Sequence, residues 1–209
     1  MLIYLLRHGL TNYNVELRYQ GMWGESVLTD LGVEQAKEAG EHLSPVPFDR
    51  IYVSGAIRAA QTATYAFPTR TEEFIYRDDL REIGTGELTN QLHADAALAY
   101  GERITKIKSN EDYAEFGGES TADVRARAAK VAKDILSAGG KCVCVVSHGA
   151  FIRFLTEAFT SIPYHALSLY RNCAYTVIEH DGDVGVLQLH NVTAKDNLLY
   201  PTVKKAGAV

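Results

Sequence analysis

Cysteine is scarce in this chain of 209 residues, and its three copies are an odd number. Cys142 and Cys144 alternate within an apolar run, and Cys173 stands alone. Such alternation is typical of small side chains buried in a strand. No second pair of Cys or His residues stands at ligand spacing, so a metal site at these cysteines is a poor interpretation. The pattern favours reduced thiols and a cytoplasmic protein.

Long apolar runs and an excess of basic residues are also missing. The apolar runs are far shorter than a bilayer span, and the amino terminus has no basic stretch followed by a long apolar region. We therefore expect neither a membrane segment nor a secretory signal. The net charge of −5 disfavours a nucleic-acid partner. It still allows a local cluster of arginines that binds a small anion.

Two short apolar runs each lead to a histidine that is followed by a glycine. The runs and their ends are residues 2–6 with Arg7-His8-Gly9, and residues 142–146 with Ser147-His148-Gly149. Short apolar runs of this kind are typical of strands buried on both faces. Ligands of open α/β sheets bind beyond the carboxyl ends of the strands. The repetition therefore predicts a site at one edge of a sheet, to which both histidines contribute.

The rest of the chain alternates between strand and helix patterns. Further strands are expected over 50–53, 74–76, 175–179 and 184–189, and helices over 30–43, from 58, from 121 to 138 and from 150. Ser120 and Asp123 resemble a capping box at one helix start. The order predicts a three-layer α/β/α sandwich with a mostly parallel sheet. We expect a single domain over 1–209, with a weakly helical insertion near 87–117 beside the site.

The polar motifs, taken in order, resemble the histidine phosphatase superfamily, the group of cofactor-dependent phosphoglycerate mutases and related phosphatases. The matching motifs are Arg7-His8-Gly9 with Asn14, Ser54-x-x-x-Arg58-Ala59-x-Gln61-Thr62-Ala63, Leu80-x-Glu82, Gly117-Gly118-Glu119-Ser120, Ser147-His148-Gly149 and Asn172-Cys173-Ala174. They span nearly the whole chain. Each motif alone is weak, but together they are specific.

The resemblance implies a role for each matching residue. His8 would be the nucleophile that accepts the phosphoryl group, and Glu82 the proton donor and later the base. The phosphate would be held by Arg7, Asn14, Arg58, His148 and the amide of Gly149, and the substrate would also contact Gln20 and Gly21. Phosphoryl transfer depends mainly on positioning and on stabilisation of negative charge. Two arginines and a protonated His148 would supply that charge, so we expect no metal and no cofactor.

Other interpretations of single residues remain open. Arg58 alone would more often be a surface residue, and Glu82 competes with Glu87 and Asp79 for the role of acid. Glu119 is expected to be structural, holding an arginine or a helix amino terminus. The aromatic residues Tyr19 and Trp23 either line the pocket or pack within a loop.

The expected function is hydrolysis of a small phosphomonoester through a phosphohistidine. A phosphoglycerate mutase is the first alternative, and the short insertion, in which Arg103, Lys106 and Lys108 precede acidic residues, disfavours it. A non-catalytic module that binds a phosphorylated ligand is the second. Leu10, and Glu25 in the loop before the first long helix, depart from the usual pattern where the organic part of a substrate would rest. The partner would be a small phosphorylated metabolite; the oligomeric state stays open, with a homodimer as one option.

Overall fold

The computed structural model describes residues 1–200, apart from the side chains of residues 108 and 109. Its strands are β1 (Leu2–Arg7), β2 (Arg50–Ser54), β3 (Phe74–Arg77), β4 (Cys142–Ser147), β5 (Tyr175–His180) and β6 (Gly185–Val192). Its α-helices are α1 (Asn12–Glu16), α2 (Asp30–Leu43), α3 (Ile57–Ala66), α4 (His93–Tyr100), α5 (Glu102–Asn110), α6 (Thr121–Ala138) and α7 (Gly149–Thr160). Short 3-10 helices cover Thr71–Glu73, Asp78–Leu80, Gly86–Leu88, Ala114–Phe116, Tyr164–Ala166 and Ala194–Asp196.

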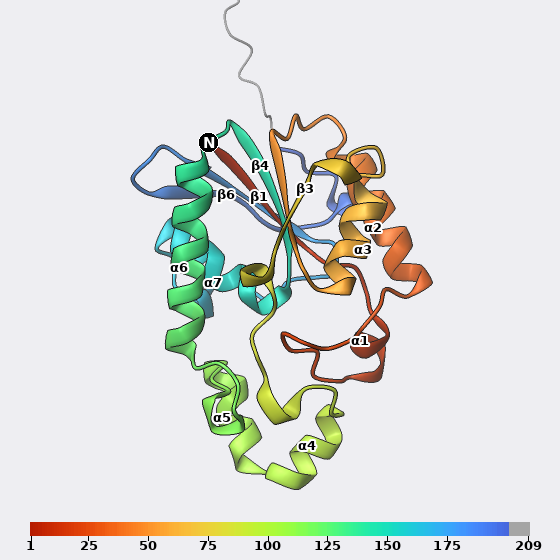
Figure 1. Ribbon diagram of the computed structural model, residues 1–209, viewed down its shortest axis with the longest axis vertical. Coiled ribbons are helices and arrows are strands. Elements are labelled where there is room, and N and C mark those ends of the chain that lie inside the picture. Colours follow the sequence, from red (N-terminus) through yellow and green to blue (C-terminus); the bar gives the residue numbers. More distant parts are fainter. Residues whose placement is uncertain (201–209) are drawn as a thin grey trace, which may run out of the picture.

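The strands form one six-stranded sheet in the order β3-β2-β4-β1-β5-β6. The strands β3, β2, β4 and β1 are parallel, and β5 and β6 are antiparallel at one edge. Helices α2 and α3 cover one face, and α6 and α7 cover the other (Figure 1). The predicted α/β/α sandwich with a mostly parallel sheet is confirmed.

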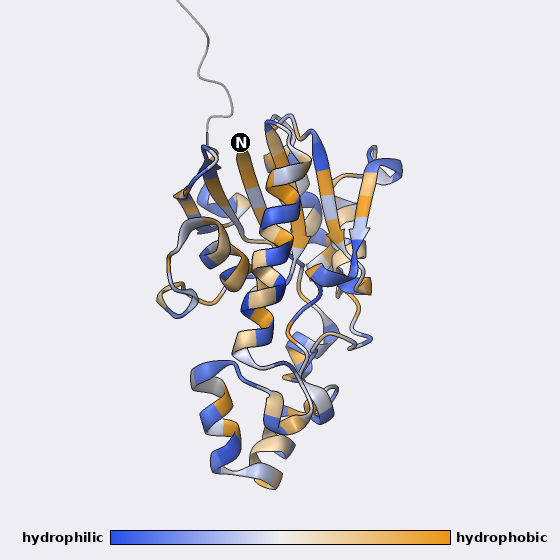
Figure 2. Cartoon of the chain, turned by 60° about the vertical axis from the view of Figure 1, so that its left-hand side comes forward, coloured by the Kyte–Doolittle hydropathy of each residue, from blue (hydrophilic) through white to orange (hydrophobic). Residues whose placement is uncertain are grey.

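The residues of β1 divide between the two layers of core. Ile3 and Leu5 pack with α6 and α7, whereas Tyr4 and Leu6 pack with α2 and α3. This alternation follows from the two-residue period of a strand. Both faces are apolar, so the sheet is largely orange in Figure 2, while α6 alternates between orange and blue along its length.

The starts of α2 and α6 are capped by side chains. The Thr29 side chain accepts a hydrogen bond from the Gly32 amide at the start of α2. Ser120 and Asp123 form the predicted capping box at the start of α6. Among the described residues, no helix is long and apolar enough to cross a membrane.

The segment between β3 and α6 lies beyond the carboxyl ends of the parallel strands, where α4 and α5 extend away from the sheet (Figure 1). It has a small core of its own, built from Leu88, Ala96, Ile104, Ile107 and Phe116 together with Tyr19. The sequence shows no strong core pattern here because part of this core comes from the distant residue Tyr19.

Candidate active site

The two histidines meet at the carboxyl ends of neighbouring parallel strands. Arg7 of β1 pairs in register with Ser147 of β4, so the residues that follow, His8 and His148, lie side by side. Their ring centroids are 5.3 Å apart, and both side chains are buried. The structure thus brings together the two motifs whose repetition predicts the site.

His8 is held in one tautomer by its own loop. Its Nδ1 lies 2.8 Å from the Gly9 carbonyl oxygen, which can only accept, so Nδ1 carries the proton and Nε2 keeps its lone pair. Burial lowers the pKa of His8 well below its usual value, and the charges of Arg7 and Arg58 lower it further. A neutral imidazole with a free Nε2 is the form that attacks phosphorus.

A close backbone contact positions the loop that carries His8. A Cβ on Gly9 would lie 2.5 Å from the Gly32 carbonyl oxygen, and a Cβ on Gly32 would lie 2.1 Å from the Leu10 carbonyl oxygen. Only glycine at both positions permits this approach. The Gly9 amide also donates to Thr62 Oγ1 of α3 at 3.0 Å. The loop is therefore anchored to α2 and α3.

Arg58 is completely buried, so its interpretation as a surface residue is wrong. Its Nη2 donates to the Gly21 carbonyl at 2.9 Å, and its Nε donates to His148 Nδ1 at 3.2 Å. Burial lowers the pKa of Arg58 to about 10, which leaves the guanidinium charged at neutral pH. The role of Gly21 in the structure is to hold Arg58 by its carbonyl.

Arg7 is the second arginine in the site. Its Nη1 donates to the Tyr170 carbonyl, while its buried Nε has no hydrogen-bond partner among the described residues. A Cβ on Gly149 would lie only 3.1 Å from this Nε, so the glycine leaves space for the guanidinium. An unpaired N–H in this position is the kind of donor that a bound phosphate oxygen satisfies.

The expectation of a protonated His148 concerns the site with phosphate bound, whereas in this structure the ring is held by Arg58 and Ser54. Its Nδ1 accepts the Nε–H of Arg58, and its Nε2 lies 2.8 Å from Ser54 Oγ. Burial and the charges of Arg58, His8 and Arg7 lower the pKa of His148 well below the usual value. The ring is therefore neutral, and the fixed positive charge of the site comes from the two arginines.

Glu82 lies at the start of α7. Its Oε1 accepts from the Phe151 amide at 2.9 Å and from the Ile83 amide at 3.0 Å, and its Oε2 accepts from the Ala150 amide at 3.2 Å. These donors and the helix dipole stabilise the carboxylate. Its negative charge also acts on both Arg7 and Arg58 by Coulomb attraction.

The two competing acids are placed elsewhere. Asp79 forms an ion pair of 2.6 Å with Arg77, which lowers the pKa of Asp79. Glu87 is exposed on a 3-10 helix. Glu82 is thus the acid candidate that shares a site with the histidines and arginines.

Asn14 lies in α1 and Gln20 in the loop after it, in the segment that follows His8. Asn14 Oδ1 accepts from the Thr11 amide at 3.2 Å, and Gln20 Oε1 accepts from Ser26 Oγ at 2.7 Å. Both amide oxygens are therefore occupied, which leaves the amide NH2 groups as the ends available to a ligand. No ligand contact of these residues is tested, so their binding roles stay predictions.

Other residues support the site through hydrogen bonds, although the sequence analysis gave them no role in the reaction. Asn172 Nδ2 donates to the His8 carbonyl at 3.2 Å, and Ser54 bonds His148. Both stand in motifs that carry the family resemblance, which is the signal that points to them. Glu119 binds Arg127 at 2.7 Å, so its predicted structural role is confirmed. Trp23 is 65% exposed, and the Arg81 guanidinium lies over its ring.

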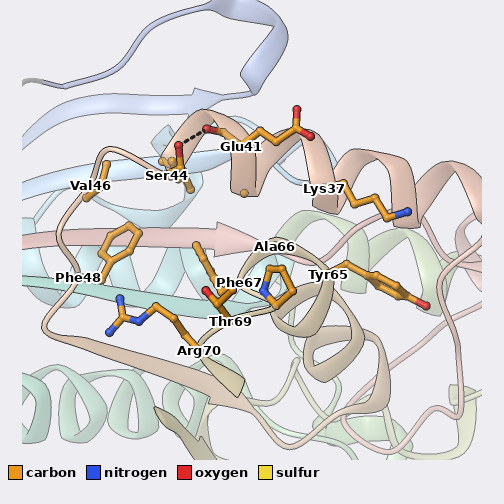
Figure 3. A pocket seen from close by; sticks show the side chains of 13 residues that line it. Lys37, Glu41, Ser44, Val46, Phe48, Tyr65, Ala66, Phe67, Thr69 and Arg70 are labelled. Atoms are coloured by element: carbon orange, nitrogen blue, oxygen red, sulfur yellow. Dashed lines mark hydrogen bonds between the residues drawn. The ribbon is translucent and has the colours of Figure 1, made fainter. Parts of the chain in front are cut away.

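One cavity lies away from these residues. It has a volume of about 540 Å³ and is lined by the carboxyl ends of α2 and α3, with Phe48, Tyr65 and Phe67 among its side chains (Figure 3). Because α3 follows β2, its end returns to the opposite, amino-terminal edge of the strand. Among the described residues, no group of three or more His, Cys, Asp or Glu side chains is placed to hold a metal ion.

Comparison with known proteins supports the family assignment. A profile of the histidine phosphatase superfamily (branch 1) matches residues 3–193, which confirms the resemblance predicted from the motifs. The chain is 31% identical over 182 residues to a probable 2-carboxy-D-arabinitol-1-phosphatase of Arabidopsis thaliana, with 85% of this chain and 37% of that protein covered. The chain therefore spans little more than a third of that plant relative. It is also 31% identical over 184 residues to a probable phosphoglycerate mutase GpmB of an Enterobacter species, with 85% and 84% covered.

Solved structures match over almost the whole described chain. A mycobacterial glucosyl-3-phosphoglycerate phosphatase in complex with VO3 aligns with a TM-score of 0.84 at 28% identity, covering 92% of this chain and 99% of that chain. YhfR of Bacillus stearothermophilus aligns with a TM-score of 0.84 at 30% identity, covering 92% and 98%. The relatives thus include proteins named as phosphatases and as mutases.

Proposed function

The chain belongs to the histidine phosphatase superfamily, and we propose that it hydrolyses a small phosphomonoester through a phosphohistidine at His8. The observation that carries the proposal is the state of His8: Nδ1 is fixed on the Gly9 carbonyl and Nε2 is free, beside two charged arginines. This arrangement supports nucleophilic attack by a neutral imidazole. We expect the substrate to be a small phosphorylated metabolite and the protein to be cytoplasmic.

In the first step, His8 Nε2 forms a bond to phosphorus while the bond from phosphorus to the ester oxygen breaks. Glu82 gives a proton to the leaving alkoxide, so an alcohol departs. Arg7 and Arg58 stabilise the charge on the equatorial phosphoryl oxygens, and the NH2 group of Asn14 adds a further donor. The proposed phosphate site also uses the Gly149 amide at the start of α7.

In the second step, water attacks the phosphohistidine and Glu82 takes the proton. The bond from His8 to phosphorus breaks, inorganic phosphate leaves, and the neutral imidazole is restored. A bound phosphate dianion favours the protonated form of a neighbouring histidine. We therefore expect His148 to gain a proton only when phosphate binds and takes over the Arg58 Nε–H.

Charge pairing favours a hydrolase over a mutase. A mutase must retain a bisphosphorylated intermediate, which requires a second cationic pocket. Here Arg103 of the insertion is paired with Glu115 at 2.7 Å, and Arg153 is paired with Glu111 at 2.5 Å. These arginines already have carboxylate partners, so a second phosphate would have to compete for them.

The test is phosphate release from a panel of phosphomonoesters, assayed with a chelator and without added metal. We expect turnover that the chelator does not reduce and that vanadate inhibits by mimicking five-coordinate phosphorus. We also expect phosphate release from 3-phosphoglycerate to exceed its conversion to 2-phosphoglycerate. Efficient interconversion with little free phosphate would instead identify a mutase, and binding without turnover would identify a non-catalytic module.

A further inference from the structure

The two ring nitrogens of His148 have different neighbours, which together fix the position of its single proton. Nδ1 lies 3.2 Å from Nε of Arg58, a charged guanidinium that can only donate. Nδ1 must therefore accept, and in the neutral ring the proton is on Nε2. Nε2 lies 2.8 Å from Ser54 Oγ, so the serine hydroxyl accepts this hydrogen bond. His8 has the opposite tautomer, with its proton on Nδ1.

The position of Ser54 follows from the pairing of the strands. It is the last residue of β2, which lies parallel to β4 and hydrogen-bonds to it. The carboxyl ends of the two strands are therefore neighbours, and Ser54 is completely buried beside His148. Its Oγ also lies 3.4 Å from the amide of Ala56, the N-cap residue of α3. Ser54 thus contacts both His148 and the start of the helix that carries Arg58.

The surroundings of His148 oppose a second proton on its ring. Burial is the largest cause of its lowered pKa, and four groups from three elements lower it further: Arg58 of α3, His8 and Arg7 from β1 and its loop, and Arg127 of α6. The acid of the site, Glu82, is bound to amides at the start of α7. The hydroxyl of Ser54 is neutral, whereas a carboxylate in its place would favour an imidazolium even without a ligand. His148 therefore stays neutral until an anion binds.

We propose that Ser54 is a positioning residue that directs the proton taken up with phosphate to Nδ1 of His148. The inference rests on the proposed function, in which a phosphate oxygen replaces Nδ1 as the acceptor of the Arg58 Nε–H. The monoanion of the ester, whose second pKa is about 6, then gives its proton to Nδ1. The ester becomes a dianion and the ring becomes an imidazolium. Nε2 keeps its proton and its hydrogen bond to Ser54 throughout.

The hydrogen bond to Ser54 is stronger for the imidazolium than for the neutral ring. A bond from a charged donor is roughly twice as strong as a bond from a neutral one. The hydroxyl therefore stabilises the protonated state of His148 in particular, and the new Nδ1–H donates to the same phosphate that Arg58 holds. Loss of the Ser54 oxygen should lower the proton affinity of the phosphate-bound ring by about tenfold, which corresponds to one pH unit.

The test follows His148 by NMR in protein labelled with 15N at histidine, with its signals assigned from the spectrum of His148→Gln. In the free wild type we expect the proton on Nε2 of His148 and on Nδ1 of His8, so the two rings report opposite tautomers. A proton on Nδ1 of His148 in the free enzyme would overturn the inference without any variant of Ser54. At saturating inorganic phosphate, both nitrogens of His148 should be protonated. Ser54→Ala should lose the second proton about one pH unit lower than the wild type does.

Ser147→Ala is the matched control. Ser147 is also completely buried and precedes His148 in the chain, but its hydroxyl donates to the Leu80 carbonyl at 2.7 Å. This variant should leave the titration of His148 unchanged, and Ser54→Thr, which keeps the oxygen, should restore it.

Activity provides a second measurement, because kcat/KM for p-nitrophenyl phosphate should fall by about tenfold in Ser54→Ala. Identical titrations of His148 in Ser54→Ala and in the wild type would overturn the role of Ser54, even if kcat/KM falls. Failure of the wild type both to bind phosphate and to hydrolyse any ester would instead overturn the proposed function.

Discussion

The two edges of the sheet are built from the same strands and helices but have opposite character. The carboxyl edge gathers His8, His148, Arg7, Arg58 and Glu82, with each side chain held by backbone groups or by a neighbour. The amino edge has a cavity whose lining includes the aromatic rings of Phe48, Tyr65 and Phe67 (Figure 3). The comparison teaches that the candidate active site of this fold is recognised by its oriented charges and fixed tautomers, and not by the volume of a cavity.

The strongest test of this contrast is His8→Ala. Loss of the nucleophile should reduce turnover to background while circular dichroism shows an unchanged fold. Brief exposure of the wild type to labelled substrate should leave a label that is stable to base and labile to acid, as expected for a phosphohistidine. Substantial activity in the variant would remove His8 from the mechanism.

Glu82→Gln should cost roughly 10²- to 10⁴-fold in kcat with an alkyl phosphate, the range of general acid–base catalysis. The glutamine keeps an oxygen for the α7 amides but has no proton to give to the leaving group. With p-nitrophenyl phosphate, whose leaving group is stable as an anion, the burst of phosphorylation should lose much less. Equal losses in the burst with both substrates would show that Glu82 is not the acid.

Phe67→Ala examines the amino edge. Phe67 is buried and packs against Phe48 with ring centroids 5.8 Å apart, so its truncation should lower the free energy of unfolding by about 3–5 kcal/mol. We expect kcat/KM to be unchanged at a temperature where the variant is folded. A large loss of kcat/KM in the folded variant would instead connect the two edges functionally.

The smallest expected effect is on how the free energy of unfolding changes with pH. His8 and His148 have pKa values well below 6.5 in the folded chain, whereas in the unfolded chain they take up protons near 6.5. Stability is therefore lost as pH falls from about 6.5 toward the folded pKa values. We measure the free energy of unfolding in urea at several pH values between 6.5 and 5. Its slope against pH should be smaller in His8→Ala than in the wild type by up to about 1.4 kcal/mol per pH unit. An identical slope would show that His8 is protonated in the folded state.

Local sequence patterns predicted the elements that position the site. Apolar runs that lead to His8 and His148 located β1 and β4, and the Ser120–Asp123 pair located the start of α6. The hydrogen bonds of His148 in this structure could not be predicted, because they depend on the side-chain direction of Arg58, a residue 90 positions away.

The glycine contact between the loop of His8 and α2 has a consequence for mutational tolerance. Gly9 and Gly32 approach each other through main-chain atoms, so no side chain adjusts the distance between them. A saturation library of α2 should therefore accept many residues along its exposed face and almost none at Gly32. The position of His8 is therefore independent of the side chains on the exposed face of α2, and those side chains can change without moving the loop that carries it.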